Sequence, residues 1–179
     1  MDENLSQCGE AATIPDSLAD ALSSCILAVD HVAVAVPDLS VAIEWYVKKL
    51  GFRLLETRLT RGEHTAMKSA VVVAGTAVVV LIQGTSPESQ VARFIEHFGP
   101  GVQHIAFCVQ DMDVALERIR SSGGSAATPL LSTPGLRQVF LTRDEGSGVR
   151  IELIERRGGE FSDESVERLF REFETRDLF

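Results

Sequence analysis

The sequence predicts an α+β domain made of two β-α-β-β-β units and a C-terminal helix. Two stretches carry this prediction, DHVAVAVPDLSVAIEWY from Asp30 and QHIAFCVQDMDVALERI from Gln103. Each contains a histidine, an apolar strand-like run, an aspartate placed to cap a helix, and apolar residues at helical spacing. We interpret this repeat, with a period of roughly 73 residues, as an internal duplication.

Composition excludes several classes of function. The chain has 179 residues, of which 45% are hydrophobic, and a formal net charge of -9. This length favours one domain, and no apolar run approaches the ~20 residues that a membrane-spanning helix needs. Nucleic acids and anionic lipids attract clustered Lys and Arg, which an acidic chain does not provide. We therefore expect a soluble protein without nucleic-acid or membrane partners.

The cysteines and the first residues favour a cytoplasmic location. Cys8, Cys25 and Cys108 are odd in number, lie far apart and form no CxxC pair, so neither a disulfide framework nor a zinc knuckle is expected. The first ten residues are acidic where a signal peptide carries positive charge. We expect a protein of the reducing cytoplasm.

The first unit is predicted over residues 28–84, after a partly ordered arm at residues 1–27. A strand ends at Pro37, Asp38 caps the following helix, and Gly51 stops it. Trp45 and Tyr46 on this helix are expected to pack against the sheet. Three further strands follow, over residues 53–59, 65–73 and 77–83.

The second unit is predicted over residues 102–157, after a short helix at residues 87–98. It repeats the same order, with a helix capped by Asp111 and strands over residues 127–131, 137–142 and 148–155. Residues 158–179 form a tail helix with Ser162 as N-cap and an apolar face, made of Val166, Leu169, Phe170 and Phe173. This apolar face must be buried against another part of the protein.

Three polar side chains in apolar strands are candidate metal ligands, namely His31, His104 and Glu152. Because strand side chains alternate, each histidine shares its face with small residues, which leaves room for a ligand. A buried carboxylate is costly unless it meets a cation. Two imidazoles and one carboxylate leave several positions of an octahedral ion open, as in non-haem Fe(II) oxygenases. These residues favour oxygen chemistry.

From about residue 29 to 156 the chain resembles the vicinal oxygen chelate superfamily, which includes the glyoxalases, bleomycin-resistance proteins and dioxygenases. The resemblance implies that the two units form one cupped mixed sheet around a metal site. Within it, the chain is most similar to the C-terminal, catalytic half of the 4-hydroxyphenylpyruvate dioxygenase family. The matching stretches are TAMKSAVV, SQVARFIEHFGPGVQHIAF, LRQVFLTRDEG, IELIERRG and GGEFSDESVERLFREFE. The last of these covers the tail helix, which in that family closes over the active site.

The resemblance implies an iron-dependent dioxygenase that decarboxylates and hydroxylates a small 2-oxo acid with dioxygen. It implies Fe(II), with Co(II) or Mn(II) as alternative ions, bound by His31, His104 and Glu152, and no catalytic residue beyond the metal centre. The substrate pocket that it implies consists of Ser69, Gln90, Gln103, Gln138, Phe140 and Phe161. Because chains of this superfamily often pair through their first strands, a homodimer is also expected.

The chain departs from the dioxygenase pattern at several places. The family's N-terminal half and a long insertion between Gly124 and Arg137 have no counterpart here. The family's asparagine near the end of the fourth strand corresponds at best to Gln83, and its second tail phenylalanine corresponds to Val166. These differences lie in the substrate pocket and leave the proposed metal ligands intact.

Two other functions stay open. The stretch SPESQVARFIEHFGPGVQHIAFCVQDMDVALERI is also similar to the methylmalonyl-CoA epimerase family. That family has a fourth metal ligand where this chain has Val79, and commonly a second histidine where it has Gln103. Without the fourth ligand, the open-site dioxygenase is favoured over an epimerase or isomerase. A non-catalytic protein that binds a small molecule is the third alternative, but it would be expected to lack the histidine pair.

Overall fold

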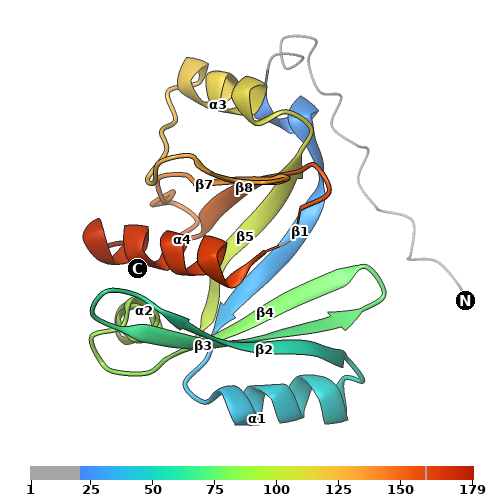
Figure 1. Ribbon diagram of the computed structural model, residues 1–179, viewed down its shortest axis with the longest axis vertical. Helices are drawn as coiled ribbons and strands as arrows, with labels where there is room; N and C mark the ends of the chain where they lie inside the picture. Colours follow the sequence, from blue (N-terminus) through green and yellow to red (C-terminus); the bar gives the residue numbers. More distant parts are fainter. Residues whose placement is uncertain (1–20, 160) are drawn as a thin grey trace, which may run out of the picture.

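One eight-stranded sheet organises the molecule, and the computed structural model describes it over residues 21–159 and 161–179. The strand order is β2-β3-β4-β1-β5-β8-β7-β6, and the sheet curls into a half-barrel (Figure 1). The strands are β1 (Ile26–Ala35), β2 (Arg53–Arg61), β3 (Ala66–Ala74), β4 (Ala77–Gly84), β5 (Gly101–Val109), β6 (Leu131–Thr133), β7 (Leu136–Phe140) and β8 (Arg150–Arg156). The predicted α+β fold class is confirmed.

The helices lie on both sides of the curled sheet. They are the 3-10 turn η2 (Leu22–Cys25), α1 (Leu39–Glu44) with its π-helical continuation η3 (Trp45–Lys49), α2 (Gln90–Phe98), α3 (Met112–Ser121) and α4 (Asp163–Thr175). In Figure 1, α1 and α3 cover the outer faces of the two halves, and α4 crosses the open side between them. No helix among the described residues is long and apolar enough to cross a membrane.

The strand pairing reproduces the duplication. β1 pairs in parallel with β4, as β5 pairs in parallel with β8, and the two units meet through the antiparallel pair of β1 and β5. The helix starts are also equivalent, because the Asp38 and Asp111 carboxylates each accept two main-chain N–H groups of the following turn. Both predicted caps are confirmed.

Two apolar cores lie on the outer face of the sheet, one for each unit. In the first unit, Val34 and Leu81 pack against Leu39 of α1, and in the second, Leu153 packs against Met112 of α3. Large apolar side chains of the central strands therefore point towards the helices. The concave face carries the small residues beside the histidines, as the alternation predicts.

Three expectations need correction or limitation. Trp45 is 56% exposed, because the helix changes to π-helical winding there and this changes the phase, so that only Tyr46 packs inwards. The strand predicted over residues 127–131 begins only at Leu131. Pro129 has no N–H for a ladder, and Thr128 instead accepts the Phe140 N–H with its hydroxyl. Most of the expected N-terminal arm lies outside the described residues.

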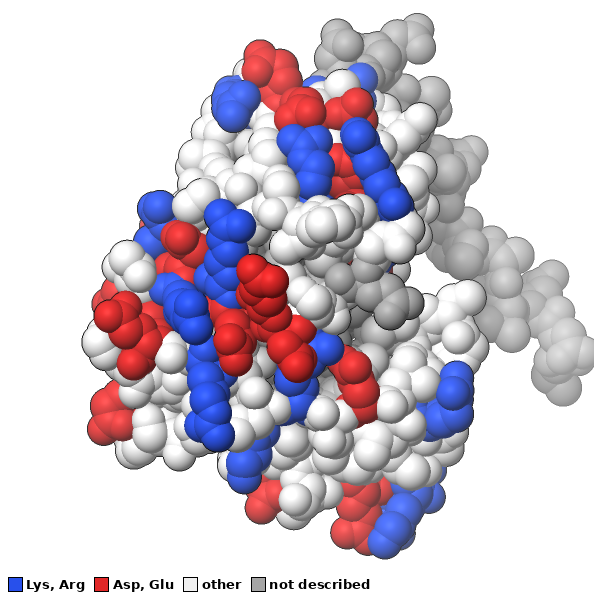
Figure 2. Space-filling view, viewed as in Figure 1, with Lys and Arg blue, Asp and Glu red and all other residues white. Residues whose placement is uncertain are grey.

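The tail forms a helix where its period predicts one. Ser162 and Ser165 form a capping box at the start of α4. The apolar face points into the molecule, with Phe170 and Phe173 buried, while charged residues of both signs cover the outer face (Figure 2). α4 is therefore a covering element whose inner surface is available to build a site.

Candidate metal centre

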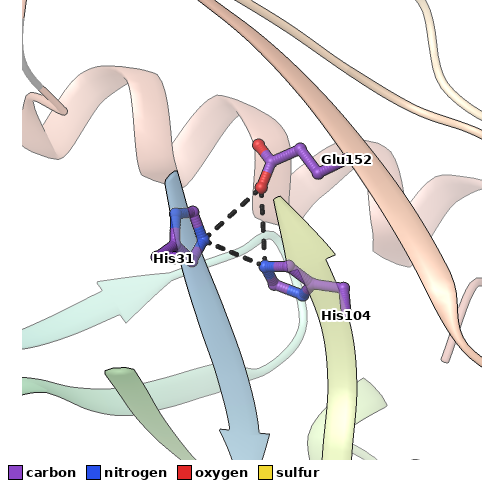
Figure 3. A group of neighbouring side chains, drawn as sticks. All are labelled: His31, His104 and Glu152. Atoms are coloured by element: carbon purple, nitrogen blue, oxygen red, sulfur yellow. Dashed lines mark hydrogen bonds and ion pairs between the residues drawn. The ribbon is translucent and has the colours of Figure 1, made fainter. Parts of the chain in front are cut away.

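Three potential ligand atoms converge on the concave face of the sheet, one each from β1, β5 and β8 (Figure 3). The Nε2 atoms of His31 and His104 lie 3.2 Å apart. Glu152 Oε2 lies 3.5 Å from His31 Nε2 and 3.4 Å from His104 Nε2. The structure thus brings together the three residues that the sequence predicts as metal ligands.

The sheet register explains why these side chains meet. Ala106 on β5 is paired with His31 on one side and with Glu152 on the other, so these two residues flank it on neighbouring strands. His104 lies two residues before Ala106, and side chains two apart on a strand share a face. Ala106 has a very small side chain and is fully buried. The three polar groups therefore surround a space that Ala106 leaves open.

The triangle has the size that a single divalent ion requires. Ligand atoms about 2.1 Å from an ion lie about 3.0 Å apart at an octahedral angle and about 3.4 Å apart at a tetrahedral angle. The observed edges of 3.2 to 3.5 Å lie close to these values, nearer the tetrahedral one. Because the three atoms form one face, the opposite side of an octahedral ion would be left for other ligands.

Each histidine is held by the residue immediately before it. The Nδ1 atom of His31 donates to Asp30 Oδ1 at 2.9 Å, and Nδ1 of His104 donates to Gln103 Oε1. A carboxylate or amide oxygen can only accept, so both rings carry their proton on Nδ1 and direct the Nε2 lone pair at the site. The duplication has thus preserved the ring orientation in both units.

The charges around the site favour a cation. Burial raises the pKa of Glu152 to about 7, and its Oε1 has no hydrogen-bond partner among the described residues. Burial, followed by the charges of His31 and Arg150, holds the pKa of His104 well below its usual value. His104 is therefore neutral at pH 7, as a ligand must be. A divalent ion would compensate the buried carboxylate.

Asp30 is the most strongly held charge next to the site. Burial acts to raise its pKa, but hydrogen bonds from His31 and Arg156 outweigh this effect and lower the pKa strongly. The Arg156 guanidinium binds both oxygens, at 2.6 and 3.0 Å, and lies 4.9 Å from the centre of the Phe161 ring. A chain of contacts therefore joins the segment before α4 to His31.

A cavity of about 140 Å³ opens at the triad. Five of the six residues predicted for the substrate pocket line it: Ser69, Gln90, Gln103, Phe140 and Phe161. Gln138 is buried but lies outside the lining, two residues along β7 from Phe140. It is the counterpart of Ser69 in the duplication, because these residues face Ile154 and Ile82 on the adjoining strands.

Sequence reasoning missed much of the cavity wall. From β2, β3 and β4 come Glu56, Arg58, Met67, Val71, Val80 and Ile82. Their strands were predicted, but the curl of the sheet that brings β2 and β3 over the metal site depends on contacts distant in sequence. Only the alternation of β3 could have helped, because Met67, Ser69 and Val71 share one face of that strand. It would have placed Met67 and Val71 in the cavity wall together with Ser69.

The register also corrects the position of the absent fourth ligand. Glu152 is opposite Ala106 on β5, and the equivalent pairing in the first unit places Val80 opposite Ala33. Val80 lines the cavity, whereas Val79, the position predicted from the sequence, packs in the core beneath α1. A shift of one residue reverses the face of a strand. The position remains apolar, so β4 supplies no fourth ligand.

Residues 28–153 match the Glyoxalase/Bleomycin resistance protein/Dioxygenase superfamily. The chain belongs to this superfamily. Its members are mostly enzymes that bind small-molecule substrates and divalent metals, and they often form dimers. The resemblance found in the sequence is thereby confirmed at the level of the superfamily.

Individual relatives have several activities. A 4-hydroxyphenylpyruvate dioxygenase of Hordeum vulgare is 31% identical over 134 residues, which are 70% of this chain and 30% of that enzyme. A methylmalonyl-CoA epimerase structure from Mycobacterium tuberculosis is 32% identical, with a TM-score of 0.63 over 74% of this chain and 89% of that one. A 4-hydroxymandelate synthase variant from Streptomyces coelicolor is 22% identical, with a TM-score of 0.73 over 86% and 55%, and shows the fold alone.

Proposed function

We propose that this protein is a non-haem Fe(II)-dependent dioxygenase that decarboxylates and hydroxylates a small 2-oxo acid. The observation that carries the proposal is a face of three ligands, His31, His104 and Glu152, with apolar Val80 at the counterpart of Glu152. Such a face leaves room for a bidentate acid and for dioxygen on one ion. The 4-hydroxyphenylpyruvate dioxygenase relative supports the reaction class.

The protein's own part is to hold the ion, orient the acid and exclude water. When bound, Fe(II) supplies the activation of dioxygen, of which one oxygen atom enters the new carboxylate and the other a hydroxyl group. Asp30 and Gln103 keep both imidazole lone pairs directed at the ion. Phe140 stands edge-on to His104, with ring centres 5.0 Å apart, and Phe161 does the same to His31 at 5.9 Å. These rings make the surroundings of the ion dry.

Substrate positioning is assigned to the polar residues that line the cavity. Gln90 and Ser69 are buried in its wall, and the Nε2 of Gln90 has no hydrogen-bond partner among the described residues. An unpaired buried donor is costly, and an acceptor on the substrate would satisfy it. Gln138, behind the wall, is assigned a supporting role.

The epimerase is the second candidate, and the 32% identity to a methylmalonyl-CoA epimerase favours it. Removal of an acidic proton requires bases on both sides of the carbon. Among the described lining residues, Glu56 is the one carboxylate outside the triad, and it is paired with Arg58 at 3.3 Å. α4 also covers the cavity, so the long CoA part of an acyl-CoA thioester would have to extend past this helix. Both features favour the dioxygenase.

Oxygen uptake and proton exchange separate these functions. The protein is reconstituted anaerobically with Fe(II), supplied with 2-oxo acids and then exposed to air-saturated buffer. Oxygen consumption with release of carbon dioxide is the expected result. In a parallel sample, the Co(II) or Mn(II) protein is incubated with methylmalonyl-CoA in deuterated water. Deuterium incorporation there, with no oxygen uptake in the iron sample, would establish the epimerase instead.

A further inference from the structure

The size and the chemistry of the cavity wall restrict the substrate. The cavity of about 140 Å³ has apolar walls beyond the triad: Met67, Val71, Ile82 and Val91 from the sheet and α2, and Leu169, Phe170 and Phe173 from α4. Its polar groups away from the ligands are few, and the charged ones, Glu56 and Arg58, are already paired with each other. The space therefore suits a short apolar group.

The walls are fixed by contacts along the whole of α4. Arg58 binds Asp163 at 3.0 Å and the Phe161 carbonyl at 3.2 Å at its start. Near its end, Glu174 accepts the hydroxyl of Thr65 at 2.6 Å. In between, the Phe173 ring stands edge-on to Phe140 at 4.8 Å. Movement of α4 away from the sheet to widen the cavity would break these charged and aromatic contacts together.

The volume of the cavity limits the size of the ligand. A dry protein cavity of about 150 Å³ holds one benzene molecule. The 2-oxo acid group alone has five non-hydrogen atoms, and part of it would lie against the ligand face. A branched chain of three or four carbons brings the acid to eight or nine non-hydrogen atoms, whereas a hydroxyphenyl group with its methylene brings it to thirteen, more than twice the six of benzene.

We infer that the site selects a compact 2-oxo acid with a short branched apolar side chain over one with a phenolic ring. This inference rests on the proposed function for the 2-oxo acid group, while the size limit comes from the cavity wall. Met67 is a wall residue whose truncation would enlarge the space, because it is half-buried on β3, lines the cavity and packs against the apolar cluster that contains Ile82 and Phe94.

Binding tests the size limit without turnover. Calorimetry on the anaerobic Fe(II) protein compares 4-methyl-2-oxopentanoate with 4-hydroxyphenylpyruvate. We expect the smaller acid to bind at least about tenfold more tightly, because an added group that overfills a packed site is excluded. Equal or tighter binding of 4-hydroxyphenylpyruvate would overturn the inference. Selective binding of the small acid without oxygen uptake would contradict the proposed function and leave the size limit standing.

A pair of variants locates the effect. Met67→Ala enlarges the cavity and should reduce the preference for the smaller acid about tenfold. Leu130→Ala removes a similar side chain from the core beneath α3, outside the cavity, and should leave the preference as it is in the wild type. If both variants changed the preference equally, the wall at Met67 would not be its cause.

Discussion

At the scale of single residues, the centre depends on two pairs of neighbours, Asp30 with His31 and Gln103 with His104. In both pairs the first residue accepts a hydrogen bond from the Nδ1–H of the second. The Asp30 acceptor is negatively charged and the Gln103 acceptor is neutral. The charge of Asp30 is compensated by Arg156. The duplicated unit has therefore kept one geometry with two electrostatic environments.

Replacing Asp30 tests this arrangement. Asp30→Asn keeps the shape but removes the negative charge that accepts the hydrogen bond from Nδ1–H of His31, and we expect metal affinity to fall about 10- to 100-fold. Competitive titration with a chelating dye measures the effect. Asp111→Asn is the matched control, since Asp111 caps α3 and Asn caps equally well. A similar loss in both variants would contradict a specific role of Asp30.

The residue types found in the sequence were sufficient to predict that these three side chains lie together, and their role as metal ligands stays a prediction. The two histidines occupy equivalent positions in the repeat, and a glutamate in the apolar run RIELIE needs a cation. The fourth-ligand position was placed one residue away, at Val79, because β4 is apolar on both faces and its alternation gives no register. Nothing in the sequence indicated that Glu56 and Arg58 line the cavity, since charged residues on an edge strand usually face solvent.

At the scale of elements, α4 joins the two units by covering their common cavity. Its Glu174 carboxylate accepts main-chain N–H groups of the turn between β2 and β3, from Glu63 at 2.5 Å and Thr65 at 2.8 Å. Gly62 in this turn makes the approach possible, because a side chain there would collide with the carboxylate. Near its C-terminal end, the helix is therefore anchored to this turn by Glu174.

This anchor predicts a dependence on pH. Partial burial acts to raise the pKa of Glu174, but hydrogen bonds from Thr65 and from the main chain of Glu63 outweigh it, so the pKa is lowered from its ordinary 4.5. Its stabilising contribution is therefore complete above pH 4.5 and is lost as the pH falls through the lowered value. Glu174→Gln should lower the melting temperature at pH 7 and narrow the difference from the wild type below pH 4.

A control separates this contact from surface charge in general. Glu172→Gln removes a carboxylate two residues away on the same helix, which among the described residues pairs with Arg176 at 3.1 Å near the surface. Such pairs contribute little, so this variant should melt like the wild type at both pH values. Equal destabilisation by the two substitutions would show that Glu174 does not anchor α4.

The predicted helices and strands are correct where local sequence signals exist, and the predictions are wrong where those signals are absent. The caps Asp38 and Asp111 and the apolar period of α4 placed three helices correctly. The outward turn of Trp45 depends on π-helical winding, which propensity does not encode. β6 began later than predicted because of Pro129, which the run of apolar residues around it concealed.

At the scale of the whole molecule, the proposed metal ligands come from both units, so metal binding would be linked to folding. The two units share the central pair β1 and β5 and should unfold in one transition. The expected homodimer and cytoplasmic location remain predictions. A ligand that binds across both units should stabilise the entire domain.

Metal should therefore raise the melting temperature. At a free Co(II) concentration one hundred times the dissociation constant, stabilisation is about 2.7 kcal/mol, which corresponds to roughly 5 to 10 °C for a domain of this size. Glu152→Ala removes one ligand and should abolish the shift while leaving a folded domain. Differential scanning calorimetry measures both, and an unchanged shift in the variant would show that Glu152 is not a ligand.

The open side of the ligand face is the central claim, and nitric oxide tests it most directly. Electron paramagnetic resonance is recorded on the anaerobic Fe(II) protein with nitric oxide, before and after addition of 4-methyl-2-oxopentanoate. The account predicts a nitrosyl signal that changes shape but persists when the acid binds, because three positions of the ion are free for both molecules. Loss of the signal on addition of the acid, or no signal at all, would contradict an open site.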